Sequence, residues 1–174
     1  MNLIVLKKFS VPLALVPEGV TTFPFEGVGT DFSGEKGNFF PDPISGKARV
    51  TAVDDDYLVE LNLKSMGKFV CDRCGISYSR KVQGEIKTLF TTDPVKWEGK
   101  QDADTRQLDP YSQEIDFSQD VLDALVLAIP IKSLCHKDCR GLCPHCGINR
   151  NEESCSCSDD KTDPRWDALE KISF

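Results

Sequence analysis

The sequence has few histidines, and it lacks the short motifs that identify many enzymes. Only two of its 174 residues are histidine, His136 and His145, and both lie among cysteines. There is no Gly-x-Ser-x-Gly turn, and the glycines of GVGTDFSGEKG have neither the Gly-x-Gly-x-x-Gly spacing nor a Gly-Lys-Ser/Thr ending. We therefore expect a protein that is not an enzyme and has no small-molecule substrate.

Long apolar runs are also absent. No stretch approaches the roughly 20 apolar residues that a membrane-spanning helix needs. The start, MNLIVLKKFSVPLALVPEG, is interrupted by Lys7, Lys8, Pro12 and Pro17 and has no small-residue cleavage pattern, so it is not typical of a signal peptide. We expect a cytoplasmic protein with no membrane partner. In that reducing compartment, closely spaced cysteines indicate metal binding or catalysis more than disulfides.

Positive charge is in the minority. The chain has 21 basic and 28 acidic residues and a formal net charge of -7. This balance excludes a protein that coats nucleic acid over its whole surface. Basic residues nevertheless gather near the cysteines, where they are candidate contacts to RNA or to another partner: Arg73, Lys137, Arg140, His145 and Arg150.

The first half of the chain has the alternating pattern of β-strands. In VTAVDDDYLVELNLKS, an acidic turn precedes a segment whose apolar residues alternate with polar ones, and SYSRKVQGEIKTLFTT repeats this pattern. FSVPLALVPEG and TTFPFEG resemble shorter strands, and Pro12 and Pro24 favour positions at a sheet edge. We expect a mainly antiparallel sheet.

The second half has different patterns. Residues 91–114 are polar, acidic and rich in proline, which predicts a mobile or functional loop. DFSQDVLDALVLAIP predicts a core helix at about 117–129 that ends before Pro130, and DPRWDALEKI predicts a short terminal helix. The expected fold class is α+β, with a β-rich main domain at 1–134 and a Cys-rich module at 135–174.

Cysteine is abundant where histidine is not. The eight cysteines form four closely spaced pairs, enough for two tetrahedral sites, and Cys-x-x-Cys-Gly occurs twice, as CDRCG and CPHCG. Zinc favours such four-sulfur sites and is then structural. We expect two zinc ions, with iron–sulfur or redox chemistry as the alternatives. The predicted ligands are Cys71, Cys74, Cys135, Cys139, Cys143, Cys146, Cys155 and Cys157.

The four pairs can share two metals in three ways. Placing Cys71/Cys74 with Cys143/Cys146 is least favoured, because two such turns normally belong to different sites. Cys71/Cys74 can instead join Cys135/Cys139 or Cys155/Cys157, and both remain open. We prefer Cys135/Cys139, because the other site then closes within fifteen residues, from Cys143 to Cys157. His136 and His145 are then predicted to be surface residues.

Several of these motifs carry a family resemblance. FVCDRCGISYSRKV, the helix ending in Leu-x-x-Pro, and CRGLCPHCGINRNEESCSC followed by Asp163–Arg165 resemble the YceD-like family of bacterial and plastid proteins. The resemblance covers roughly residues 40–172 and is strongest in its second half, where Arg140 stands at a position at which lysine is also common. Some members lack the C-terminal cluster, which supports the preferred partition.

The resemblance implies a role in accumulation of large-subunit ribosomal RNA. The expected protein is a non-enzymatic zinc-binding factor in ribosome biogenesis, whose partner is that RNA, a ribosomal protein, or both. One alternative is an acidic, chaperone-like module that holds a basic ribosomal protein through QDADTRQLDPYSQEID. A third hypothesis is a thiol redox or metal sensor.

Overall fold

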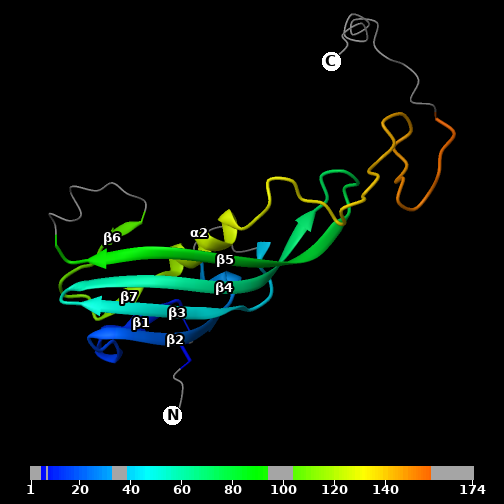
Figure 1. Cartoon of the computed structure of the whole chain (residues 1–174). Helices are drawn as coiled ribbons and strands as arrows, with labels where there is room; N and C mark the ends of the chain where they lie inside the picture. Colours follow the sequence, from blue (N-terminus) through cyan, green and yellow to red (C-terminus); the bar gives the residue numbers. More distant parts are fainter. Residues whose placement is uncertain (1–4, 7, 33–38, 94–103, 158–174) are drawn as a thin grey trace, which may run out of the picture. The chain divides into compact units, whose positions relative to one another are not determined.

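The structure is a computed structural model that describes residues 5–6, 8–32, 39–93 and 104–157. The chain divides into two compact units (Figure 1). Unit 1 consists of Met1–Phe69 and Ser77–Ser133, and unit 2 consists of Val70–Ile76 and Leu134–Phe174. Unit 2 thus combines a short turn from the middle of the chain with the C-terminal part.

A five-stranded sheet forms most of unit 1. Its strands follow the order β2-β3-β4-β5-β6. The β2–β3 and β3–β4 pairs are antiparallel, whereas β6 runs parallel to β5. The strands are β2 (Gly19–Gly27), β3 (Ile44–Val53), β4 (Asp56–Val70), β5 (Ser77–Thr91) and β6 (Thr105–Gln107).

A second layer covers one face of this sheet. It contains a two-stranded antiparallel sheet and helix α2, with Phe25 of the large sheet 5.6 Å from the ring of Phe117. The layer and its connections comprise β1 (Ser10–Pro12), β7 (Glu114–Asp116), α2 (Ser118–Leu127) and the 3-10 turns η1 (Leu13–Leu15) and η2 (Gly29–Asp31). The apolar core lies between the two layers.

Strand alternation decides which residues enter the core. On β4, Val59, Leu61 and Leu63 are buried while the residues between them face outward, as a half-buried strand requires. The turn between β3 and β4 contains Asp54 with a φ of 52°, and aspartate is one of the residues that tolerate this left-handed conformation. The predicted acidic turn and the strand after it are confirmed.

The α+β class is confirmed, with differences in detail. The core helix spans Ser118–Leu127 rather than about 117–129, and the Asp116 carboxylate accepts a 2.8 Å hydrogen bond from the Ser118 N–H. Pro24 lies on the edge strand β2, as expected. The predicted terminal helix lies outside the described residues. None of the helices in the described part of the chain has the length and apolar character needed to cross a membrane.

The acidic segment at 91–114 contains structure that the sequence did not predict. Thr105–Gln107 form β6, and Leu108 after it is 6% exposed. Arg106 contacts the buried carboxylate of Asp120 through a 2.9 Å bond to Oδ1. The C-terminal part of the predicted loop is therefore built into unit 1.

Candidate metal centres

The two Cys-x-x-Cys-Gly motifs of unit 2 form turns with the same hydrogen bonds. In the first, the Gly75 N–H donates to the Cys71 carbonyl and the Cys71 N–H donates to the Ile76 carbonyl, both at 2.9 Å. In the second, Gly147 donates to Cys143 at 2.9 Å and Cys143 donates to Ile148 at 2.8 Å. Gly75 and Gly147 have φ values of 71° and 77°, which explains why both motifs end in glycine.

These turns stabilise a thiolate on their first cysteine. Burial raises the pKa of the Cys71 thiol, but backbone N–H groups of Cys135, Cys74 and Arg73 outweigh it and lower the pKa to about 6. At Cys143, the N–H groups of Cys146 and His145 dominate and likewise lower the pKa to about 6. Each turn therefore presents a sulfur that is charged near neutral pH, the form that binds a metal.

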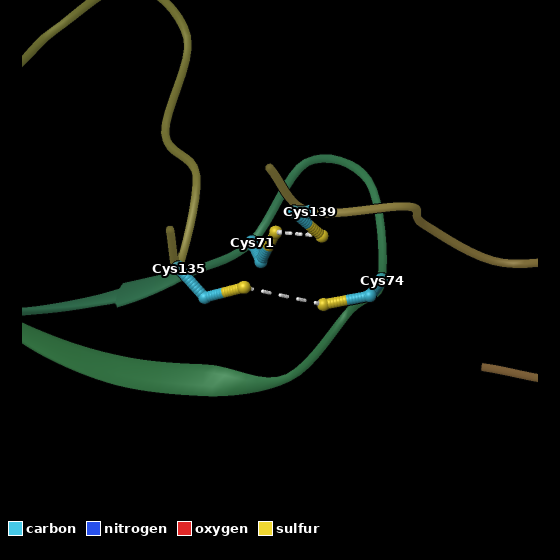
Figure 2. Close-up of side chains that lie close together, drawn as sticks. All are labelled: Cys71, Cys74, Cys135 and Cys139. Atoms are coloured by element: carbon cyan, nitrogen blue, oxygen red, sulfur yellow. Dashed lines mark hydrogen bonds between the residues drawn. The ribbon is translucent and has the colours of Figure 1, made fainter. Parts of the chain in front are cut away.

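The first cluster brings together Cys71, Cys74, Cys135 and Cys139 (Figure 2). Their four sulfur atoms lie within 4.8 Å of one another. Sγ of Cys71 is 3.8 Å from Sγ of Cys139, and Sγ of Cys74 is 3.7 Å from Sγ of Cys135. All eight cysteines of the chain are free, and these separations are far longer than the roughly 2.05 Å of a disulfide.

The sulfur separations fit a tetrahedral metal ion. Four sulfurs at about 2.3 Å from a zinc ion at the centre of a tetrahedron lie about 3.8 Å from one another. The two measured edges of the first cluster, 3.8 and 3.7 Å, have this length. The side chains could therefore hold such an ion with little movement.

The second cluster brings together Cys143, Cys146, Cys155 and Cys157, again with all sulfurs within 4.8 Å. It is the more exposed of the two. Cys143 is buried, but Cys146 is exposed and Cys155 and Cys157 are half-buried, whereas the first cluster has three buried cysteines. The second cluster is therefore more accessible to solvent and to competing ligands.

At least one cysteine of each cluster keeps its proton when no metal is bound. Burial, followed by the sulfurs of Cys139 and Cys71, raises the pKa of Cys135 to about 12. The sulfur of Cys146, followed by burial, raises the pKa of Cys157 to about 12. A metal ion must displace these protons, so its binding depends on pH.

Side chains next to the cysteines hold the two clusters in place. Arg73, in the first turn, donates a 2.7 Å hydrogen bond to the Cys139 carbonyl. Arg150 lies 3.9 Å from Sγ of Cys143. The side-chain amide of Asn151 donates to Sγ of Cys139 at 3.4 Å. A cation thus lies beside the sulfur of Cys143, and an N–H donor contacts the sulfur of Cys139.

The structure shows where the site residues predicted from the sequence lie. The eight cysteines fall into the two groups that we preferred from their spacing; their role as metal ligands remains a prediction. Arg73 and Arg150 lie against cluster atoms, while Lys137, Arg140 and His145 are exposed. Asn151 had no predicted role, although the Asn-x-Asn spacing after the second turn was a signal.

The fold and the clusters define a class: α+β proteins in which a β-rich unit is joined to a unit with two four-cysteine clusters that could hold metal ions. The family model described as "Large ribosomal RNA subunit accumulation protein YceD" matches residues 59–173. The chain belongs to this family. The match begins in β4 and includes α2 and all eight cysteines.

Individual relatives have moderate similarity. A chloroplastic Arabidopsis thaliana protein, named large ribosomal RNA subunit accumulation protein YCED homolog 1, is 28% identical over 124 residues, 57% of this chain and 39% of the relative. An uncharacterized protein of Mycobacterium tuberculosis strain H37Rv is 30% identical over 122 residues, 70% of this chain and 58% of the relative. The chain thus spans less than two thirds of these relatives. No solved structure matches it significantly.

Proposed function

We propose that this protein is a non-catalytic, zinc-binding factor that supports the accumulation of large-subunit ribosomal RNA. The observation that carries the proposal is the family match over residues 59–173, which includes both cysteine clusters. The name of the Arabidopsis relative supports the same role. We further propose that the protein acts in the cytoplasm, where it acts by binding and uses no small-molecule substrate.

Depletion and complementation test the proposed role. Cells depleted of the protein should contain less large-subunit than small-subunit ribosomal RNA, and the wild-type chain should restore the ratio. An unchanged ratio after depletion would contradict the proposal. Fractionation of the same cells into membrane and cytoplasmic fractions tests the location.

The proposed metal is zinc, with one ion in each cluster. Support comes from the all-sulfur ligand sets and from the 3.7 and 3.8 Å sulfur separations. Purified protein should contain about two zinc ions per chain. Cys71→Ser and Cys143→Ser should each remove a different ion. Bound iron, or loss of the same single ion in both variants, would contradict the assignment.

Direct contact with RNA is one way in which the protein could act. The contacts expected from the sequence are Arg73, Lys137, Arg140, His145 and Arg150. Arg73 and Arg150 already contact cluster atoms, so we propose that their main role is to position the clusters. The remaining charges of this set to test are Lys137 and Arg140, both exposed.

Binding of a basic ribosomal protein is the second candidate. The net charge of -7 favours it. Asp104 and Asp109 are exposed beside β6, so acidic groups of the proposed segment are presented by unit 1. A pull-down from ribosome-free lysate should then recover basic large-subunit proteins, and Asp104→Asn with Asp109→Asn should slow their association. Recovery of RNA alone would contradict this candidate.

A thiol or metal sensor is the third candidate. The exposed Cys146 favours it, because a sensor needs an accessible sulfur. Mild peroxide should then oxidise the second cluster and change the level of ribosomal RNA in cells that carry the wild-type chain. If both clusters keep their metal and the level of ribosomal RNA does not change after such treatment, the sensor role is contradicted.

A further inference from the structure

The large sheet of unit 1 has one face that the second layer does not cover. Along β3 and β4, buried residues such as Val50 and Leu61 alternate with exposed ones such as Lys47 and Asn62. We call the side formed by these outward-pointing residues of β2–β5 the outer sheet face. It is a solvent-facing surface opposite the core.

Six exposed cations lie on the outer sheet face. Glu60 of β4 pairs in register with Arg49 of β3 and lies 2.6 Å from Nζ of Lys87, which places residues of β3, β4 and β5 on the same face. Strand alternation places the others there too. The six cations are Lys47, Arg49, Lys64, Lys68, Lys81 and Lys87.

The charge of this face is opposite to that of the rest of the protein. Its outward-pointing carboxylates are Glu26, Asp56, Glu60 and Glu85, so six cations stand against four acids. The rest of the chain then holds the other 15 of 21 basic and 24 of 28 acidic residues. A positive face on an acidic protein indicates a polyanionic partner.

Most of the cations on this face are available. Glu60 lies between Arg49, at 3.6 Å, and Lys87, at 2.6 Å, so one carboxylate is shared by two cations. The side chains of Lys47, Lys64, Lys68 and Lys81 form no hydrogen bond or ion pair with other described residues. Their ammonium groups are free to contact a ligand.

The same face is hollowed. An open hollow of about 710 Å³ crosses β2 to β5. Lys47 lies opposite Asn62 in the strand register, and Lys64 lies opposite Ser45. The polar side chains that line the hollow include Lys47, Asn62, Lys64 and Gln83, together with the carboxylates of Glu26 and Glu85. Ammonium groups, side-chain amides and two carboxylates therefore share one open hollow of ligand size.

We propose that the outer sheet face is a binding surface for single-stranded RNA, which rests on the proposed function in ribosomal RNA accumulation. Lysines contact phosphates, and amides such as Asn62 and Gln83 can form hydrogen bonds with base edges, which are accessible in unpaired RNA. Among the described residues, the outward positions of β2–β5 contain no aromatic side chain on which bases could stack. Binding is therefore dominated by phosphate contacts, with strong salt dependence and weak sequence preference.

Three matched variants of the full, zinc-loaded chain test the surface. The first neutralises the face with Lys47→Gln, Lys64→Gln and Lys81→Gln. The second keeps its charge with arginine at the same three positions. The third makes an equal change elsewhere, at three exposed cations outside this face, with Lys8→Gln, Arg80→Gln and Lys132→Gln. The probe is a fluorescent single-stranded RNA of about 15 nucleotides, titrated at several salt concentrations.

The expected result is specific to the face. Each lost phosphate contact reduces the magnitude of the negative slope of log affinity against log salt by about 0.7, so the slope of the glutamine variant of the face should be smaller in magnitude by about 2. The arginine variant and the Lys8/Arg80/Lys132 variant should keep the wild-type slope. Wild-type binding by the glutamine variant of the face would overturn the proposal, as would loss of binding only in the Lys8/Arg80/Lys132 variant.

Three further outcomes separate this proposal from the function. A wild-type chain that binds polyglutamate on this face but no RNA would overturn the proposal in favour of an acidic protein partner. In depleted cells, failure of the wild-type chain to restore large-subunit RNA would contradict the proposed function itself. Restoration by wild type and equally by the glutamine variant of the face would leave the function standing and overturn the role of the face.

Discussion

The side chain of Asn151 donates a hydrogen bond to Sγ of Cys139 across 3.4 Å. Asn151 lies in the loop of the second cluster, between Cys146 and Cys155, whereas Cys139 belongs to the first. Its Oδ1 also accepts a 2.8 Å hydrogen bond from the Arg140 N–H. One residue of the second cluster's loop thereby supports a sulfur of the first.

This contact predicts that Asn151 contributes to metal binding in the first cluster. Asn151→Asp keeps an acceptor for Arg140 but loses the donor to sulfur and adds a negative charge. Metal affinity of the first cluster should fall about 10- to 100-fold, the usual effect of losing an outer-shell partner. Competition with a chromophoric chelator measures it. Glu153→Gln, a nearby exposed change, is the control; equal affinities for both variants would contradict the role.

The thiol pKa values predict how metal affinity depends on pH. Cys135 and Cys157, with pKa values of about 12, must lose a proton when metal binds at any ordinary pH. Cys71 and Cys143 are thiolates until the pH falls through their pKa of about 6. Affinity should therefore fall as the pH is lowered and fall more steeply below about pH 6, because an additional proton then competes at each cluster. A chelator titration at several pH values shows whether the slope changes.

Differences in burial predict the order in which metal is lost. Cys146 is exposed, whereas Cys71, Cys74 and Cys139 are buried. A chelator should therefore remove metal from the second cluster first. Brief chelation followed by thiol alkylation and peptide mapping should label Cys146 before Cys71 and Cys74. The opposite order of labelling would show that burial does not control release.

Local patterns explain what the sequence could predict. The strand at Tyr57–Leu63 and the core helix were predictable because each has its own hydrophobic period. Spacing and chain closure favoured the grouping of the sulfurs that the structure has, but they left a second grouping open. β6 was not predictable, because its three residues have no pattern of their own and form a strand only beside β5. The outer sheet face was missed for a similar reason, since its lysines come from three strands and gather only after the sheet forms.

The packing of helix α2 on the sheet depends on a glycine. A Cβ at Gly84 of β5 would lie 2.5 Å from the backbone oxygen of Ala124, closer than real Cβ atoms approach. Because Ala124 is in the middle of α2, the helix would have to move away from β5. The outward-facing neighbours of Gly84 on β5 are exposed, so the constraint acts on the inner face alone.

Gly84→Ala should therefore destabilise unit 1 by about 1–3 kcal/mol, as overpacking of a core does. Urea unfolding of the zinc-loaded chain measures the change. Ser79→Ala, at an exposed position of the same strand, should change the free energy of unfolding by less than about 0.5 kcal/mol. Adding Ala124→Gly should not restore stability, because the closest contact is with the backbone of Ala124 and not with its methyl group. Full rescue by Ala124→Gly would show that the methyl group, at 3.2 Å, is what the new side chain meets.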